Sequence, residues 1–252
     1  MSWQDFKKIV QNANETVKLG PKVEFYSFGK TPVLVVAPHI GGEGVEIHAE
    51  GRKVTINMCE WGTDILAAVA AREIEGSLLV SRVPRNHCDF SRSPDVLGKG
   101  ATARLGHTDL KRPVLLKTHT KNEYLPLLKS FHQKIRDTNP RFILTYHGMM
   151  SRKFDLLLGF GRRKQYIGGL RKAFQFRYKV AMQAKGLKVG VSHRRLTGES
   201  DYVLKSHTGS VCVGALVEFN KWGRPAGQTS PTGDYQELAK DVARVAAEWV
   251  TS

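Results

Sequence analysis

Cysteine is scarce in this sequence of 252 residues. The three cysteines, Cys59, Cys88 and Cys212, are odd in number and far apart in the chain. This pattern argues against a disulfide framework and against a zinc cluster held by thiolates. We therefore expect each of the three to be a small, buried hydrophobic residue.

Long hydrophobic runs are missing as well. No apolar run approaches the roughly 20 residues that a membrane-spanning helix needs. Residues 1–17 (MSWQDFKKIVQNANETV) contain acids and polar residues without the apolar stretch of a signal peptide, and they favour a short amphipathic helix. We therefore expect a cytoplasmic protein with no membrane partner.

Acidic residues are fewer than basic ones: the sequence has 23 Asp and Glu but 39 Lys and Arg, which gives a net charge of +16. Eleven of these cations, interleaved with aromatic residues, lie between Asp155 and Glu199, where there is no acid. Such a span attracts polyanions by counterion release or steers small anionic substrates. Because no known nucleic-acid motif accompanies the charge, we favour a solvated basic helix at 168–185, or steering, over dedicated nucleic-acid binding.

Residues 31–46 (TPVLVVAPHIGGEGVE) contain the stretch around which the chain is organised. Val33 to Ala37 has the pattern of a strand buried on both faces, and it stops at Pro38 and His39, just before Gly41 and Gly42. In open α/β sheets, ligands bind at the carboxyl ends of strands, and a Gly-Gly loop permits close approach by ligand or backbone. His39 is therefore either a site residue or a hydrogen-bonded residue at a strand end.

The rest of the chain alternates between strand and helix patterns. Strands are predicted at 22–28, 45–48, 53–58, 77–83, 141–146, 155–160, 188–191 and 211–219. Helices are predicted at 63–75 with Thr63 as its cap, and at 122–137, 168–185 and 234–250. Glu50-Gly51 indicates a hairpin turn, and 97–116 a long excursion. This alternation predicts one α/β domain over residues 1–252, a three-layer sandwich in which helices flank a mixed, mostly parallel sheet.

Two further groups with useful chemistry lie at strand ends. His147 follows the strand at 141–146, and Glu218 lies near the end of the apolar run at 211–219. Two imidazoles and a carboxylate make a three-ligand zinc site, and another carboxylate can serve as general base. Glu218 suits the base, because apolar surroundings raise the pKa of a carboxyl group. The loops offer several acids for the third ligand: Glu43, Glu46, Glu60 and Asp64.

Several of these motifs follow one another in the order found in N-formylglutamate amidohydrolases. They are APHIGG, the EWGTDIL segment from Glu60, SRVPRNHCDFSRSPD, His147-Gly148 and the strand carrying Glu218. The chain resembles that family over roughly Val33 to Asn220. It resembles more distantly the poly-γ-glutamate hydrolases and zinc carboxypeptidases of the same fold. The shared order carries the resemblance, since no single motif is specific.

The resemblance implies that His39, Glu60 and His147 bind Zn²⁺. Glu60 matches an acid that stands one residue before an aromatic residue near a helix start. Glu43 and Glu46 remain alternatives because they lie closer to His39 in sequence, as in the compact His-x-x-Glu of carboxypeptidases.

The resemblance also assigns roles around the substrate. Asp89 and Arg92 match the Asp-x-Asn-Arg element of the family, and Arg85 matches an arginine upstream of it. Arg92 and Arg85 would hold a substrate carboxylate or polarise the scissile carbonyl, with Asp89 in support. Asp89 and Arg92 pairing only to tie the loop is the alternative. His207, before the last core strand, is a further candidate to face the substrate.

The sequence departs from the family pattern at three places. Ser91 replaces an asparagine, which bears on specificity for formylglutamate. Thr145 stands where an acid often precedes the second histidine, and this removes a carboxylate that could orient the ligand. The segment after His147 lacks the usual serine.

The function expected from this resemblance is zinc-dependent amidohydrolysis. The substrate would be a small anionic acyl amino acid, or a γ-glutamyl or peptide-like amide carrying a carboxylate, cleaved at a carbon–nitrogen bond other than a peptide bond. One alternative is a nucleic-acid-associated protein that keeps the fold and uses the basic span between Asp155 and Glu199. Another is a hydrolase of an ester or amide borne on RNA.

Overall fold

A computed structural model describes residues 3–41, 44–57, 59–60, 62–99, 101–105, 114–149, 154–160, 186–192, 201–209, 211–220 and 232–251. Its centre is an eight-stranded sheet with the order β1-β2-β6-β3-β9-β12-β10-β11. The strands are β1 (Glu15–Gly20), β2 (Val23–Ser27), β3 (Val33–Ala37), β6 (Ser77–Ser81), β9 (Phe142–Met149), β10 (Leu156–Gly159), β11 (Val189–Ser192) and β12 (Val213–Asn220).

The sheet is mixed, with a parallel centre. β6, β3, β9 and β12 run parallel to one another, whereas β1, β2 and β10 pair antiparallel with their neighbours towards the centre. The four central strands therefore end at one edge, which is where parallel sheets place their ligand sites.

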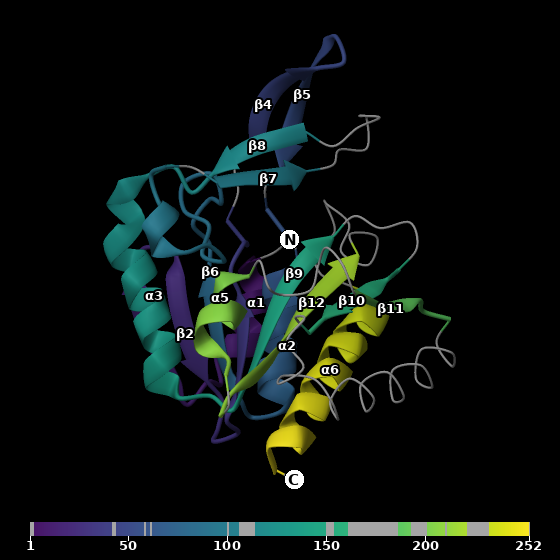
Figure 1. Ribbon diagram of the computed structural model, residues 1–252. Helices are drawn as coiled ribbons and strands as arrows, with labels where there is room; N and C mark the ends of the chain where they lie inside the picture. Colours follow the sequence, from purple (N-terminus) through teal and green to yellow (C-terminus); the bar gives the residue numbers. More distant parts are fainter. Residues whose placement is uncertain are drawn as a thin grey trace.

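Helices cover both faces of this sheet (Figure 1). On one face lie α1 (Trp3–Val10), α2 (Thr63–Glu73) and α6 (Gly233–Thr251), and on the other α3 (Leu125–Thr138) and the short α5 (Tyr202–His207). Both faces need covering because successive side chains of β3 point to opposite sides of the sheet and all of them are apolar. Val33 and Val35 pack with the first group of helices, while Leu34 and Val36 pack with the second. The predicted three-layer α/β fold is thus confirmed.

Two hairpins lie outside the central sheet. β4 (Gly44–Ala49) pairs with β5 (Arg52–Asn57), and β7 (Ala101–Leu105) pairs with β8 (Val114–Thr118). Both lie beyond the end of the sheet toward which β9 and β12 point (Figure 1). Glu50 and Gly51 have positive φ angles of 50° and 76°, as a two-residue hairpin turn requires, so the predicted turn is confirmed. The predicted excursion at 97–116 includes β7 and the start of β8, preceded by a 3₁₀ turn (Pro94–Val96).

The N-terminal prediction was wrong in one part. The helix ends at Val10, and residues 15–20 form the edge strand β1 instead of continuing it. Asn14 begins the change, because its backbone N–H donates to the Ser27 carbonyl and its side chain donates to the Phe28 carbonyl. Pairing with β2 therefore outweighs the helical pattern.

Two local predictions need correction, and two short elements were not predicted. The N-cap of α2 is Gly62, with φ of 81°, and Thr63 is the first helical residue, whose hydroxyl donates to the Glu60 carbonyl. β9 continues through His147 to Met149, because β12 pairs with it up to Asn220. The helix α5 was not predicted, and a second 3₁₀ turn (Asn122–Tyr124) precedes α3.

The predicted basic helix at 168–185 lies outside the described residues. Among the residues that are described, no helix is both long and apolar enough to cross a membrane.

Candidate metal centre

The carboxyl ends of three neighbouring strands supply the first side chains of the candidate site. His39 follows β3 by two residues, while His147 and Glu218 lie in β9 and β12. His147 and Glu218 are register partners on parallel neighbouring strands, so their side chains leave the same face of the sheet. This is the face that α3 and α5 cover, and all three side chains are buried.

Glu60 comes to the same place by a backbone contact. The chain leaves after His39, forms the β4–β5 hairpin, and returns so that the Glu60 N–H donates to the His39 carbonyl at 2.9 Å. The start of this excursion needs a glycine, because a Cβ at Gly41 would overlap the Arg82 carbonyl. The close approach predicted for this loop is therefore an approach of backbone to backbone.

His39, Glu60 and His147 form one buried cluster. His39 Nδ1 lies 3.1 Å from Glu60 Oε1, and His147 Nδ1 lies 3.3 Å from Glu60 Oε2. The two imidazole centroids are 5.0 Å apart, and one ligand atom from each of the three residues lies within 4.8 Å of the others. Residues that are distant in the sequence thus present two nitrogens and a carboxylate to one point.

A carboxylate orients each imidazole from behind. His39 Nε2 donates to Asp89 Oδ1 at 2.6 Å, and His147 Nε2 donates to Asp201 Oδ2 at 3.0 Å. With its proton held on Nε2, a neutral imidazole turns the lone pair of Nδ1 toward Glu60. This carboxylate–histidine arrangement is the one that metal sites use to fix ligand geometry.

Asp201 was not singled out from the sequence, where Thr145 was seen only to remove one possible orienting carboxylate. The start of α5 supplies an acid in place of β9. Asp201 Oδ1 accepts the Val203 N–H as the N-cap of α5, while Oδ2 accepts from His147. An aspartate at an N-cap was the only available signal, and it points to a helix start rather than to a site.

The ionisation of the cluster follows from its contacts. Burial disfavours ionised Glu60, but His39 and His147 outweigh it and hold the pKa of Glu60 well below its usual range. Burial likewise opposes ionised Asp89, yet Arg85 and His39 keep the pKa of this carboxyl low. For His147, burial disfavours the cation, but Glu60 and Asp201 raise its pKa well above the ordinary value. The site therefore already favours positive charge between its carboxylates.

The two predicted arginines lie beside Asp89. Arg85 Nε donates to Asp89 Oδ2 at 3.0 Å, and its Nη1 donates to Glu60 Oε1 at 3.3 Å. Arg92 Nε is 3.6 Å from Asp89 Oδ2 and makes no hydrogen bond there, and 30% of its side chain is exposed. Of the two arginines, only Arg85 is hydrogen-bonded to Asp89, and Arg92 is the more exposed.

The donor set fits a divalent cation. Glu60 Oε2 is buried and makes no hydrogen bond. Two imidazole nitrogens and one carboxylate are what catalytic zinc sites with an open position provide.

The other candidate residues lie elsewhere. Glu46 is 59% exposed at its side chain and pairs with Lys53 across the hairpin at 2.7 Å, while Glu43 lies outside the described residues. Asp64 is buried at the start of α2 and accepts the Ile65 N–H. Cys59, Cys88 and Cys212 are free thiols; Cys88 and Cys212 are buried as expected, whereas the expectation was wrong for Cys59, which is only half-buried.

His207 does not join the cluster in the contacts that the structure describes. It lies at the end of α5, where its Nε2 is 2.9 Å from Nδ1 of His132 in α3. Burial lowers the pKa of His132 to about 3, helped by the neighbouring His207, and burial also lowers the pKa of His207 to about 4. Both imidazoles are therefore neutral at neutral pH.

This pair should make folding sensitive to mild acid. The folded pKa of His132, about 3, lies below the ordinary 6.5, so the unfolded chain binds more protons as the pH falls below 6.5. We therefore expect His132 to lower the free energy of unfolding by roughly 2 kcal/mol at pH 5 relative to pH 7, because one pKa unit is worth about 1.4 kcal/mol. Urea denaturation at pH 7 and pH 5 measures this.

The raised pKa of His147 acts in the opposite sense, so the measurement must compare the wild type with His132→Gln. The variant should lose less stability than the wild type between the two pH values. Equal losses in both proteins would contradict the prediction.

No protein-family model matches the chain, and no curated protein matches its sequence. Solved structures do share its fold. An N-formylglutamate amidohydrolase from Ralstonia eutropha JMP134 aligns with 91% of this chain and 98% of its own, with a TM-score of 0.55 and 13% identity. A gene product from Agrobacterium tumefaciens aligns with 92% of this chain and 96% of its own, with a TM-score of 0.58 and 11% identity.

A metallo-carboxypeptidase from Pseudomonas aeruginosa aligns with 100% of this chain and 69% of its own, with a TM-score of 0.53 and 13% identity. The chain thus has the fold that is shared by an N-formylglutamate amidohydrolase and a metallo-carboxypeptidase. The predicted resemblance is confirmed at the level of the fold.

Proposed function

We propose that the protein is a zinc-dependent hydrolase that cleaves an amide bond in a substrate carrying a carboxylate. The observation that carries the proposal is the convergence of His39, Glu60 and His147, with a carboxylate behind each imidazole. The shared fold with an amidohydrolase and a metallo-carboxypeptidase supports the same class of chemistry.

Zinc would be held by Nδ1 of His39, Nδ1 of His147 and the Glu60 carboxylate. When bound, it would supply Lewis acidity to the attacking water and to the scissile carbonyl. Glu218 leaves the sheet beside His147, and in this proposal it would take a proton from the water and pass it to the leaving nitrogen. Asp89 and Asp201 hold the two imidazoles in orientation, so that ligand geometry is set before substrate binds.

The arginines set the substrate class in this proposal. The side chain of Arg92 is 30% exposed, while its buried Nε lies beside Asp89, so the terminal nitrogens of its guanidinium can take a substrate carboxylate in a bidentate manner. Arg85 is held by Asp89 and Glu60 and adds positive charge where an oxyanion develops. An N-acyl amino acid, or a γ-glutamyl or peptide-like amide, combines the required amide and carboxylate.

Metal analysis of the purified protein, followed by a panel of N-acyl amino acids, tests this function. Zinc together with hydrolysis of some panel members supports it. Protein that contains no transition metal after purification and takes up none on addition would contradict it.

The nucleic-acid alternatives depend on the basic span between Asp155 and Glu199, most of which lies outside the described residues. For a binding protein, RNA affinity should fall steeply with salt, disappear when Arg171 and Lys172 are neutralised, and survive His147→Ala. A hydrolase of RNA-borne esters or amides would instead lose its activity in His147→Ala.

Asp201→Asn tests the newly found carboxylate. Asparagine keeps the N-cap of α5 but removes the charged acceptor of His147 Nε2. We expect metal affinity to fall by about 10- to 100-fold, the usual loss when such a partner is removed, with little change in stability. Competition with a chromogenic chelator measures the affinity.

Asp95→Asn is a matched control, because Asp95 is exposed, accepts one hydrogen bond from the Ser93 hydroxyl and is not part of the cluster. It should leave metal affinity unchanged. An Asp201→Asn protein that binds metal as tightly as the wild type would show that Asp201 does not position His147.

A further inference from the structure

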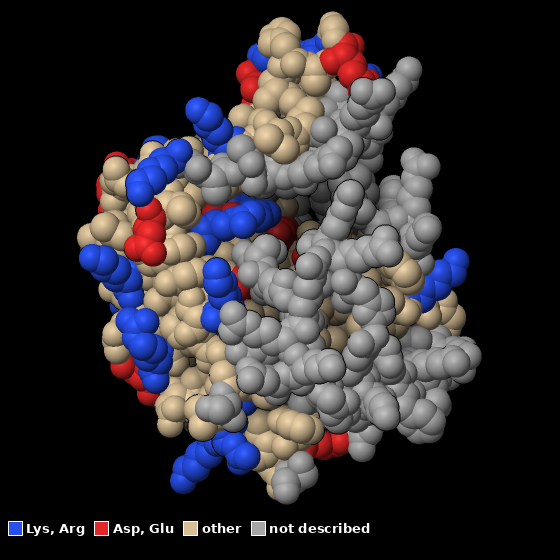
Figure 2. Space-filling view, viewed as in Figure 1, with Lys and Arg blue, Asp and Glu red and all other residues tan. Residues whose placement is uncertain are grey.

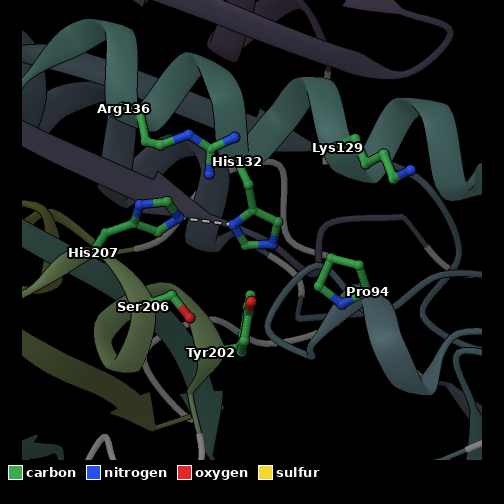
Figure 3. A pocket seen from close by; sticks show the side chains of 7 residues that line it. All are labelled: Pro94, Lys129, His132, Arg136, Tyr202, Ser206 and His207. Atoms are coloured by element: carbon green, nitrogen blue, oxygen red, sulfur yellow. Dashed lines mark hydrogen bonds between the residues drawn. The ribbon is translucent and has the colours of Figure 1, made fainter.

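A pocket lies between α3 and α5, on the same face of the sheet as the candidate metal centre. It has a volume of about 240 Å³. Lys129, His132 and Arg136 reach it from α3, and Tyr202, Ser206 and His207 reach it from α5 (Figure 3). Pro94 closes one side. Of these residues, only His207 was singled out from the sequence.

The buried end of the pocket contains an unsatisfied nitrogen. His132 is 3% exposed, and its Nδ1 is paired with His207 Nε2. Its Nε2 is buried without a hydrogen-bond partner and points into the space between Tyr202 and Pro94 (Figure 3). A buried polar atom of this kind costs free energy unless it finds a partner.

The imidazole pair can present a donor at this point. If His207 Nε2–H donates to His132 Nδ1, then neutral His132 carries its own proton on Nε2. That N–H faces into the pocket. Both pKa values are lowered, so neither ring needs to be charged for this arrangement.

Positive charge comes from α3. Lys129 and Arg136 lie on either side of His132 on the exposed side of the helix, and Lys and Arg side chains are spaced along this edge of the molecule (Figure 2). Arg136 donates Nε and Nη2 to Gln133 Oε1, which fixes its guanidinium. No described residue that lines the pocket is acidic. The pocket therefore combines a guanidinium held by Gln133 and a lysine with a buried donor.

We propose that this pocket binds the phosphate group of a small phosphorylated ligand. The His132 N–H, the hydroxyls of Tyr202 and Ser206, and the cations of α3 line the same pocket. A phosphate group has enough oxygens to accept hydrogen bonds from several such donors at once and carries the charge that the cations favour. The pocket is smaller than the roughly 300–1,000 Å³ of usual small-molecule sites, so it takes a phosphate with a short organic remainder.

Inorganic phosphate is the probe that tests this proposal, with the full chain at neutral pH and fixed ionic strength. Titration calorimetry gives Kd, and ¹H–¹⁵N spectra of the imidazoles report on His132 Nε2. We expect phosphate to shift the His132 signal and Arg136→Gln to weaken binding by about tenfold or more, since a charged hydrogen bond is worth roughly 1.5–3 kcal/mol. His132→Gln should weaken it as well.

Lys121→Gln is the matched control, because it removes one exposed cation before α3 without touching the pocket. Its Kd should equal that of the wild type. The titration is repeated after treatment with a chelator, so that phosphate held by a metal is told apart from phosphate in this pocket. The two proposals are therefore tested separately: phosphate can bind in this pocket even if the protein is not a metal-dependent hydrolase, and the protein can be such a hydrolase even if the pocket does not bind phosphate.

Three results would overturn the inference. They are an Arg136→Gln protein that binds phosphate like Lys121→Gln, a His132 signal that phosphate leaves in place, and acetate binding as tight as phosphate binding. Because Arg136 is exposed, its substitution tests the pocket even if His132→Gln fails to fold.

Discussion

Glu218→Gln should slow hydrolysis by about 10²- to 10⁴-fold, the usual contribution of a positioned general base. Glutamine has nearly the shape of glutamate and keeps an acceptor oxygen, but it cannot take a proton. Glu218 is buried beside His147 rather than within the His39–Glu60–His147 cluster, so the variant should still bind metal. Rate measurements on the best substrate of the panel, with metal analysis of the same samples, check both parts.

Glu123→Gln is the control for this experiment, since Glu123 is exposed in the turn before α3. Its rate should match that of the wild type. A Glu218→Gln enzyme that keeps more than about a tenth of the wild-type rate would mean that another group is the base.

His147→Ala should remove both metal and activity. The change takes away one of three ligands and leaves the Glu60 and Asp201 carboxylates without the imidazole between them. We expect zinc to fall from about one ion per chain to well below a tenth of that, because a site with three protein ligands loses a third of its donors. Elemental analysis measures the metal, and circular dichroism shows whether the variant folds.

His48→Ala is the matched control, because His48 is an exposed histidine on the β4–β5 hairpin. It should keep metal and rate. A folded His147→Ala protein with the wild-type metal content would place the cation elsewhere and contradict the proposed centre.

The fold was predictable where side-chain period and burial agree. β3 was predicted to the residue, because Val33 to Ala37 is buried on both faces and bounded by Pro32 and Pro38. β1 could not be predicted, because nothing in its own sequence records that an edge position beside β2 is available. α5 was missed because six residues are too few to show a helical period.

The site was predictable in part for the same reason. His39 and His147 stand out as imidazoles at the ends of apolar strands, and the resemblance drew attention to Glu60. From spacing alone, Glu60 competed with acids nearer to His39, since only the fold reveals the hydrogen bond that joins Glu60 to His39. Asp201 lies 54 residues after its partner His147, and no local pattern connects them.

The hydrogen bond between the Glu60 N–H and the His39 carbonyl separates the centre from the hairpin that interrupts it. The bond pins the two ends of the excursion, so changes within the excursion need not move either ligand. Lengthening such a loop is inexpensive, at about 0.6 kcal/mol for each doubling. Evolution can therefore reshape the β4–β5 hairpin, which stands beyond the sheet edge, while the inner geometry stays constant. A fixed set of metal ligands beside a variable hairpin would let related chains accept different substrates while keeping the same chemistry.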